Sequence, residues 1–171
     1  MVIADKPAGM AVHPQSPEGT GTVVNALLHN NRWLADMETS HAPGVVHVLA
    51  PEDRGLVVVA KSEEAHQELT QLKNEKRLIF SVRVRLNSDV EPTPHPDVVV
   101  IDHQRYDGLD VYDIDTSIGD TAQLRSSWLH GDAAASMVVY RVHVPMAQKR
   151  LDIGLGERIW LPRVDLYTAP P

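Results

Sequence analysis

The chain has 171 residues, of which 43% are hydrophobic and 23% charged, an ordinary composition for a globular domain. It has no cysteine, which excludes disulfide bridges, a thiolate nucleophile and cysteine-based zinc sites. No apolar run approaches the roughly 20 residues of a membrane span, and residues 1–6 lack the basic and apolar pattern of a signal peptide. We therefore expect a cytoplasmic protein that does not associate with membranes.

The formal net charge is −7, and the acidic residues are unevenly distributed. Residues 88–134 contain ten aspartates and glutamates against two arginines, so the rest of the chain is close to neutral. A basic strip precedes this segment at Lys73, Lys76, Arg77, Arg83 and Arg85, interrupted by Glu75. This strip is either a nucleic-acid surface or an ordinary solvated face, and its composition alone favours neither.

Apolar periodicity and turn residues predict the order of the elements. Thr22 and Ser62 are suitable N-caps for two helices. Valine-rich runs on both sides of the polar loop 50–55 are typical of strands. In chain order, we expect a strand at residues 1–4, a helix from Val23, strands at 45–49 and 56–60, a helix at 62–73, a strand at 80–86, short runs at 98–101 and 109–118, and a strand at 137–144.

Three stretches carry a family resemblance: residues 6–14 read KPAGMAVHP, residues 21–29 GTVVNALLH, and residues 43–61 PGVVHVLAPEDRGLVVVAK. In this order and at this spacing they resemble RluA-like pseudouridine synthases. The resemblance extends over residues 1–76 and is weak over 77–171. It implies one pseudouridine-synthase-like α+β domain over 1–171, with a mixed, largely antiparallel sheet and a few flanking helices. We expect no separate N-terminal RNA-binding domain.

The same resemblance implies an enzyme that isomerises a flipped-out uridine in ribosomal or transfer RNA, without a cofactor or a metal. It places the family's nucleophilic aspartate at Ala50 and the tyrosine that lies against the uracil at Leu78, which follows Lys76 and Arg77. The family arginine that pairs with the nucleophile maps to Arg150. Since a methyl group has no nucleophilic chemistry, the resemblance predicts no catalytic residue and an impaired or inactive enzyme.

Glu52 and Asp53 are the two acids that could replace the missing nucleophile. Glu52 stands where many family members already have an acid, and Asp53 lies three positions along the chain, so a carboxylate there would be misplaced. A solvated turn is the simpler interpretation of both residues. The predicted RNA-binding residues are Lys6, His47, Arg54, Lys76, Arg77, Leu78, Gln148 and Arg150.

Two hypotheses follow from these observations. The chain is a pseudouridine-synthase-like protein that acts on RNA, or it is a non-catalytic RNA-binding or protein-interaction module on the same scaffold. The second describes the activity better, because Ala50 and Leu78 replace reactive positions while the surrounding motifs are kept.

Overall fold

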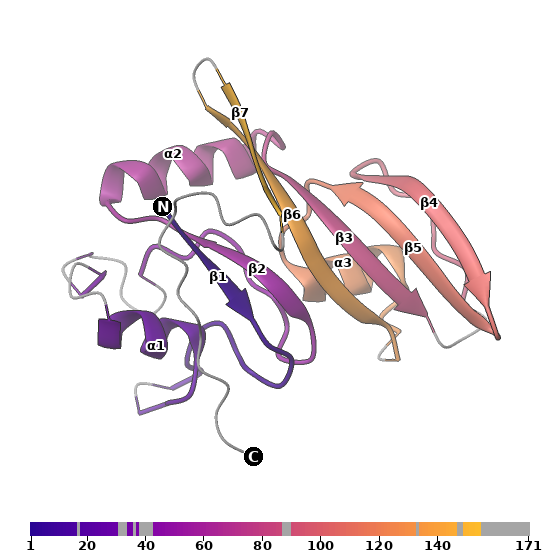
Figure 1. The fold of residues 1–171 in the computed structure, drawn as a ribbon, viewed down its shortest axis with the longest axis horizontal. Helices are drawn as coiled ribbons and strands as arrows, with labels where there is room; N and C mark the ends of the chain where they lie inside the picture. Colours follow the sequence, from indigo (N-terminus) through magenta and orange to yellow (C-terminus); the bar gives the residue numbers. More distant parts are fainter. Residues whose placement is uncertain are drawn as a thin grey trace.

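The computed structural model describes residues 1–16, 18–30, 34–35, 37, 43–86, 90–132, 134–146 and 149–154. They form a mixed, mostly antiparallel sheet flanked by helices, which confirms the expected α+β architecture (Figure 1). None of the described helices is long and apolar enough to span a bilayer. The strands are β1 (Val2–Lys6), β2 (Arg54–Val59), β3 (Ile79–Leu86), β4 (Val98–Tyr106), β5 (Leu109–Thr116), β6 (Ser136–Met146) and β7 (Lys149–Gly154), and the helices are α1 (Val23–Asn30), α2 (Glu63–Asn74) and α3 (Thr121–Trp128).

Strand β6 joins the two halves of the sheet, whose order is β1-β2-β6-β3-β5-β4. Along one edge β6 pairs antiparallel with β3. Along the other edge it pairs in parallel with β2 at Val138 and Val139, and antiparallel with β7 from Arg141 to Met146. The β1–β2 pair, whose strand β2 lies within the motif at residues 43–61, is therefore attached to the rest of the sheet through a short contact with β6.

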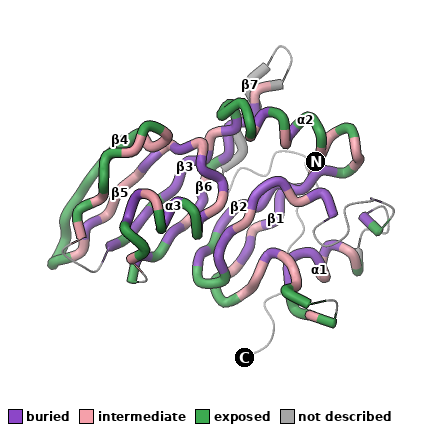
Figure 2. Tube along the Cα trace, turned by 180° about the vertical axis from the view of Figure 1, so that it is seen from behind, coloured by how far each residue is buried: buried purple, intermediate pink, exposed green. Residues whose placement is uncertain are grey.

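The predicted helix caps are present. The Ser62 hydroxyl accepts the Ala65 N–H at 3.2 Å at the start of α2, and the Thr22 hydroxyl accepts the Asn25 N–H at 3.3 Å at the start of α1. Each cap satisfies a backbone donor that has no partner within its helix. Buried residues from the helices and from β2, β3 and β6 form one continuous core, drawn as purple segments in Figure 2.

Gly55 allows β2 to cross close to β6. Its φ is +118°, and a Cβ atom at this position would lie 2.1 Å from the carbonyl oxygen of Val139. Only glycine combines this backbone conformation with so close an approach of two backbones. The glycine of the central motif is thus required by the packing of the sheet.

The prediction of a strand at residues 45–49 is wrong. Val45 forms an isolated bridge to Val59 and the Val46 N–H donates to the Val58 carbonyl at 3.3 Å, but residues 46–49 belong to no strand. Side chains take the place of the ladder: Asp120 Oδ1 accepts the Val48 N–H at 2.7 Å, and Thr121 Oγ1 accepts the Ala50 N–H at 2.8 Å. The valine-rich pattern identified a buried extended segment, but it could not show that its hydrogen-bond partners come from the start of α3.

Helix α3 and strand β7 were not predicted. The buried residues of α3 are Thr121, Leu124, Arg125 and Trp128, which have the spacing of one helix face. Two of these four positions are polar, and this hides the apolar stripe on which a sequence-based prediction depends. The strand expected at residues 137–144 is confirmed as part of β6, and the short runs at 98–101 and 109–118, to which no element was assigned, lie in or overlap β4 and β5.

His47 crosslinks the extended segment to two other elements from the interior. Its Nε2 accepts the Val58 N–H at 3.1 Å, so Nδ1 carries the proton and donates it to the Gly119 carbonyl at 3.2 Å. The ring lies against Phe80 with centroids 4.5 Å apart. Burial lowers the pKa of His47 to about 4, although its bond to the Gly119 carbonyl and the charge of Asp120 oppose the shift.

This histidine predicts a specific pH dependence of stability. The buried imidazole is neutral and has a lower pKa in the folded state than in the unfolded state. Its contribution to the free energy of unfolding is therefore fully present above about pH 6.5, decreases between pH 6.5 and 4, and stays constant below that. The contribution lost is about 3 kcal/mol. Urea unfolding gives the free energy of unfolding at each pH between 7 and 4. Plotted against pH, this free energy should have a shallower slope for His47→Gln than for the wild type, and His13→Gln should keep the wild-type slope. Equal slopes for both variants would contradict the assignment.

Candidate functional site

The loop at residues 50–53, here called the rim loop, is held in place by three hydrogen bonds to its backbone. Ala50 is bonded to Thr121 as described, its carbonyl accepts the Asp53 N–H at 3.0 Å, and the Pro51 carbonyl accepts the Gly9 N–H at 2.7 Å. Ala50 itself is 9% exposed. The rim loop therefore holds position 50 rigidly near the surface, but the side chain there is a methyl group.

The nearest buried acid is Asp53, whose carboxylate is enclosed by an ion pair. Both of its oxygens lie 2.9 Å from Nη2 of Arg125, and Oδ1 also accepts the Met137 N–H at 3.0 Å. Asp53 has no exposed surface. An aspartate next to an arginine is therefore present, but every contact of this carboxylate is inside the protein.

Arg125 connects the rim loop to α3 and to the start of β6. Its Nη1 donates to the carbonyls of Asp132, at 3.2 Å, and Ala135, and Nε has no acceptor among the described residues. Glu52 lies at the outer side of the same guanidinium, with Oε1 3.5 Å from Nη2 and a side chain that is 57% exposed. The two acids beside Ala50 thus differ: Asp53 is enclosed, and Glu52 faces solvent.

The buried side chain of Lys6 is hydrogen-bonded to the backbone of the rim loop. Its ammonium group is buried and donates to the carbonyls of Met10 at 2.6 Å, Pro51 at 3.1 Å and Pro7 at 3.1 Å. Burial lowers the pKa of Lys6 to about 8, while the charges of Asp53 and Glu52 act in the opposite direction. Three carbonyl acceptors make Lys6 a structural crosslink between the first motif and the rim loop.

The structure differs from the expectation for three of the predicted RNA-binding residues. Lys6 and Leu78 have no exposed surface, and His47 is 1% exposed. Their polar atoms are bonded within the domain, or in the case of Leu78 the side chain belongs to the core. In this conformation these residues form the scaffold of the site and present no surface to a nucleotide.

Arg54, Lys76 and Arg77 are exposed, as an RNA-contacting role requires. Arg150 lies in β7 opposite Pro145, and its side chain is outside the described atoms. Gln148 lies outside the described residues.

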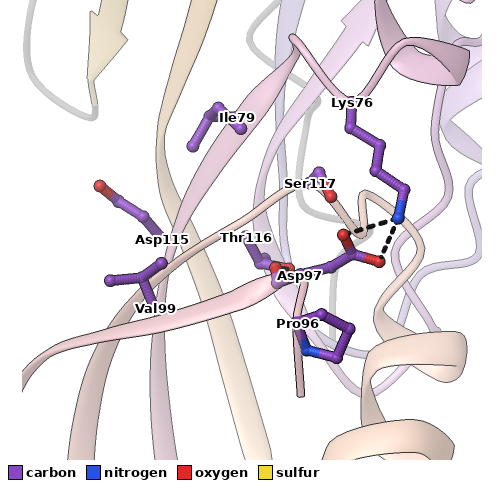
Figure 3. Close-up of a pocket in the computed structure, with 8 residues that line it drawn as sticks. All are labelled: Lys76, Ile79, Pro96, Asp97, Val99, Asp115, Thr116 and Ser117. Atoms are coloured by element: carbon purple, nitrogen blue, oxygen red, sulfur yellow. Dashed lines mark hydrogen bonds and ion pairs between the residues drawn. The ribbon is translucent and has the colours of Figure 1, made fainter.

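Acids pair with four of the five members of the basic strip, and three of the four acids come from the acidic segment 88–134. Lys76 is the clearest case, because its ammonium contacts both oxygens of Asp97 at 2.8 Å (Figure 3). This pair borders a pocket of about 380 Å³, which Asp115 and Ser117 also line. The other pairs are Lys73–Asp120 at 3.1 Å, Arg77–Glu75 at 3.0 Å and Arg83–Asp113 at 2.7 Å. The acidic segment therefore reduces the positive potential of the strip within the same domain.

Sequence reasoning missed three residues that complete the site, namely Asp120 at the N-cap position of α3 and Thr121 and Arg125 within α3. The signal that could have found Arg125 is its position as the single basic residue of its helix within an acidic segment. Among the described residues, no group of three histidine, aspartate or glutamate side chains is arranged to hold a metal ion.

The fold is that of a pseudouridine synthase domain. It matches the solved structure of human RNA Pseudouridylate Synthase Domain Containing 4 with a TM-score of 0.56, covering 88% of this chain and 82% of that one, at 14% identity. It also matches human RNA Pseudouridylate Synthase Domain Containing 1 with a TM-score of 0.54, covering 88% and 77%, again at 14% identity. At such identities the likeness concerns the fold alone.

Sequence relatives confirm the resemblance to RluA-like pseudouridine synthases. Ribosomal large subunit pseudouridine synthase D of Buchnera aphidicola is 38% identical over 79 residues, 46% of this chain and 24% of that protein. The protein of the same name from Pseudomonas aeruginosa is 42% identical over 69 residues, 40% and 21%. An RNA pseudouridine synthase of Aquifex aeolicus is 36% identical over 77 residues, 45% and 24%. The chain thus spans about a quarter of the length of these relatives, and no family model matches it.

The enclosed ion pair predicts a large difference between two neighbouring acids. Asp53→Asn should lower the free energy of unfolding by about 3–5 kcal/mol, because the charge of Arg125 is left buried without its partner. Glu52→Gln should cost less than about 1 kcal/mol, because its pair is exposed to solvent. Urea unfolding at pH 7 measures both.

A double variant separates the buried charge from simple loss of packing. Asp53→Leu combined with Arg125→Met removes both charges and should recover much of the stability lost in Asp53→Asn. If Asp53→Asn is as mild as Glu52→Gln, the carboxylate is not enclosed in solution.

Proposed function

We propose that this domain binds RNA on a pseudouridine-synthase scaffold and that its uridine isomerisation is impaired or lost. The observation that carries the proposal is the rim loop, where Ala50 supplies a methyl group and the neighbouring Asp53 carboxylate has no exposed surface. The names of the relatives, an RNA pseudouridine synthase and two ribosomal large subunit pseudouridine synthases, support RNA as the ligand.

The reaction requires a carboxylate that reaches the nucleotide. Breaking and reforming the bond between uracil and ribose needs a group that acts on the sugar or the base from within the site, aligned to within a fraction of an ångström. Asp53 is paired with Arg125 and points away from solvent into three hydrogen bonds. Moving the Asp53 carboxylate toward a nucleotide would break its buried ion pair with Arg125. The Glu52 side chain is too exposed to solvent to be held in one geometry.

A protein-interaction module is the second candidate, and the paired basic strip favours it. Three aspartates of the acidic segment already form ion pairs with cations that an RNA backbone would contact. The pairs are Lys76–Asp97, Arg83–Asp113 and Lys73–Asp120. The phosphate term that supplies much of RNA affinity is therefore reduced. RNA binding should be weak and salt-sensitive, and its complete absence at low salt would favour a protein partner.

Restoring an acid at position 50 tests the catalytic part of the proposal. Wild-type chain should release tritium from RNA labelled at uridine C5 at the background rate, and Ala50→Asp should raise that rate. Ala50→Asn, which has nearly the same shape without the charge, is the matched control and should stay at background. A wild-type rate that is well above background and is abolished by Glu52→Gln would show that Glu52 replaces the nucleophile.

Changes to the basic strip test RNA binding. Lys76→Ala with Arg77→Ala should weaken binding of single-stranded RNA and reduce the slope of log K against log salt by about 0.7 for each phosphate that the variant no longer neutralises. Asp97→Asn should strengthen binding, because it releases Lys76. Arg105→Ala on β4 is the control for loss of a charge elsewhere. If the double variant and Arg105→Ala weaken RNA binding equally for each charge removed, the strip is not an RNA surface.

A further inference from the structure

A second pocket, separate from the rim loop and the basic strip, lies where β4, β5 and the end of α3 come together (Figure 1). Its volume is about 450 Å³. Aromatic and proline side chains make up much of its lining. The lining comes from the segment before β4, from β4 and β5, and from α3, and it includes Glu91, Pro92, Pro94, Val100, Tyr112 and Trp128.

Contacts between aromatic rings hold this lining in place. Trp128 is 2% exposed, and its ring meets that of Tyr112 edge-on, with centroids 5.6 Å apart and planes at 85°. The ring of His103 stacks on Tyr112 at 4.1 Å, and Nε2 of His103 lies 2.7 Å from Oδ1 of Asp110. The pocket therefore has a defined shape before any ligand binds.

Three polar groups at the pocket have no partner among the described residues. The Glu91 carboxylate forms no ion pair, the Tyr112 hydroxyl forms no hydrogen bond, and the Trp128 indole N–H has no acceptor. Burial and the negative charges of Asp110 and Glu91 raise the pKa of Tyr112, although the charge of Arg105 opposes the shift. The pocket thus combines an apolar lining with an available carboxylate, an available donor and a negative potential.

We propose that this pocket binds an arginine side chain from an extended basic segment of a protein partner. A guanidinium group is planar and has its N–H donors in a fixed fork, so it reaches the Glu91 carboxylate and the Tyr112 hydroxyl together. Its methylene stem packs on Pro92 and Pro94. A backbone carbonyl of the same segment accepts the Trp128 N–H, which is otherwise a buried donor without a partner.

The charge of the surrounding segment selects a cation over a nucleotide. Residues 88–134 contain ten acids and two arginines, and both arginines already have acidic partners. Arg125 pairs with Asp53, and Arg105 lies 3.4 Å from Asp110. A phosphate group is therefore repelled here, and a basic segment is attracted. This inference gives the protein-interaction module a class of partner, and it does not depend on RNA binding at the basic strip.

The indole N–H of Trp128 gives a direct readout of the pocket. Heteronuclear NMR spectra of the full chain are recorded during titration with an oligo-arginine peptide at physiological salt, and the spectrum of Trp128→Phe identifies the signal. The Trp128 signal should shift and saturate. An oligo-lysine peptide of the same length should bind about fivefold more weakly or less, because an ammonium group lacks the planar fork.

Two variants that each remove one negative charge separate the pocket from general attraction. Glu91→Gln should weaken binding of the oligo-arginine peptide about tenfold, because a charge-assisted hydrogen bond is lost. Asp107→Asn, in the turn after β4, is the matched control and should change the affinity less than about twofold, because exposed charges are screened beyond about 8 Å. Both positions are exposed, so the variants should fold, which circular dichroism checks.

The proposal is overturned if the Trp128 signal does not respond to the oligo-arginine peptide, or if Asp107→Asn weakens binding as much as Glu91→Gln. It is also overturned if the lysine peptide binds as tightly as the arginine peptide, or if single-stranded oligouridine shifts the Trp128 signal and the arginine peptide does not. Lys76→Ala with Arg77→Ala should leave this titration unchanged, so its outcome is independent of RNA binding at the basic strip.

Discussion

The ion pair between Asp53 and Arg125 is the interaction on which the site depends. It joins the rim loop, which directly precedes β2, to helix α3, which precedes β6 in the chain. A buried pair of this kind adds little net stability over an apolar core, but it is costly to break. The pair therefore ties the position of the rim loop to the position of α3. Asp120 and Thr121 complete the arrangement by binding the backbone on each side of Leu49.

This arrangement explains how the domain has the fold of a pseudouridine synthase with a methyl group at position 50. Hydrogen bonds to the backbone, and not the side chain, hold Ala50 in place, so the conformation of the loop does not depend on a functional group at this position. The neighbouring acid Asp53 is paired with Arg125. The acidic segment has a separate effect, because three of its aspartates form ion pairs with cations of the basic strip. Both features are local and do not involve the pairing of the strands.

Much of the fold could be predicted from the sequence, because α2, β2 and β3 have regular apolar spacing and α1 and α2 have suitable caps. The site was harder to predict. Arg125 lies 72 residues from Asp53, and no local pattern shows that two distant charges meet in the interior. The burial of Lys6 and His47 was missed for a related reason: polar residues in a family motif suggest contact with a ligand, but here they crosslink backbone segments. The resemblance identified the motif at residues 43–61, and the structure supplied what surrounds position 50.

Carboxyl labelling of the folded chain tests the central claim most directly. A carbodiimide with glycine ethyl ester at mildly acidic pH modifies accessible carboxylates, and peptide mass spectrometry compares the two adjacent acids in one peptide. The account predicts that Glu52 is labelled in the folded protein and that Asp53 reacts only after unfolding in urea. Labelling of Asp53 at the same rate as Glu52 in the folded chain would mean that the carboxylate is open to solvent and able to reach a nucleotide, which contradicts the account.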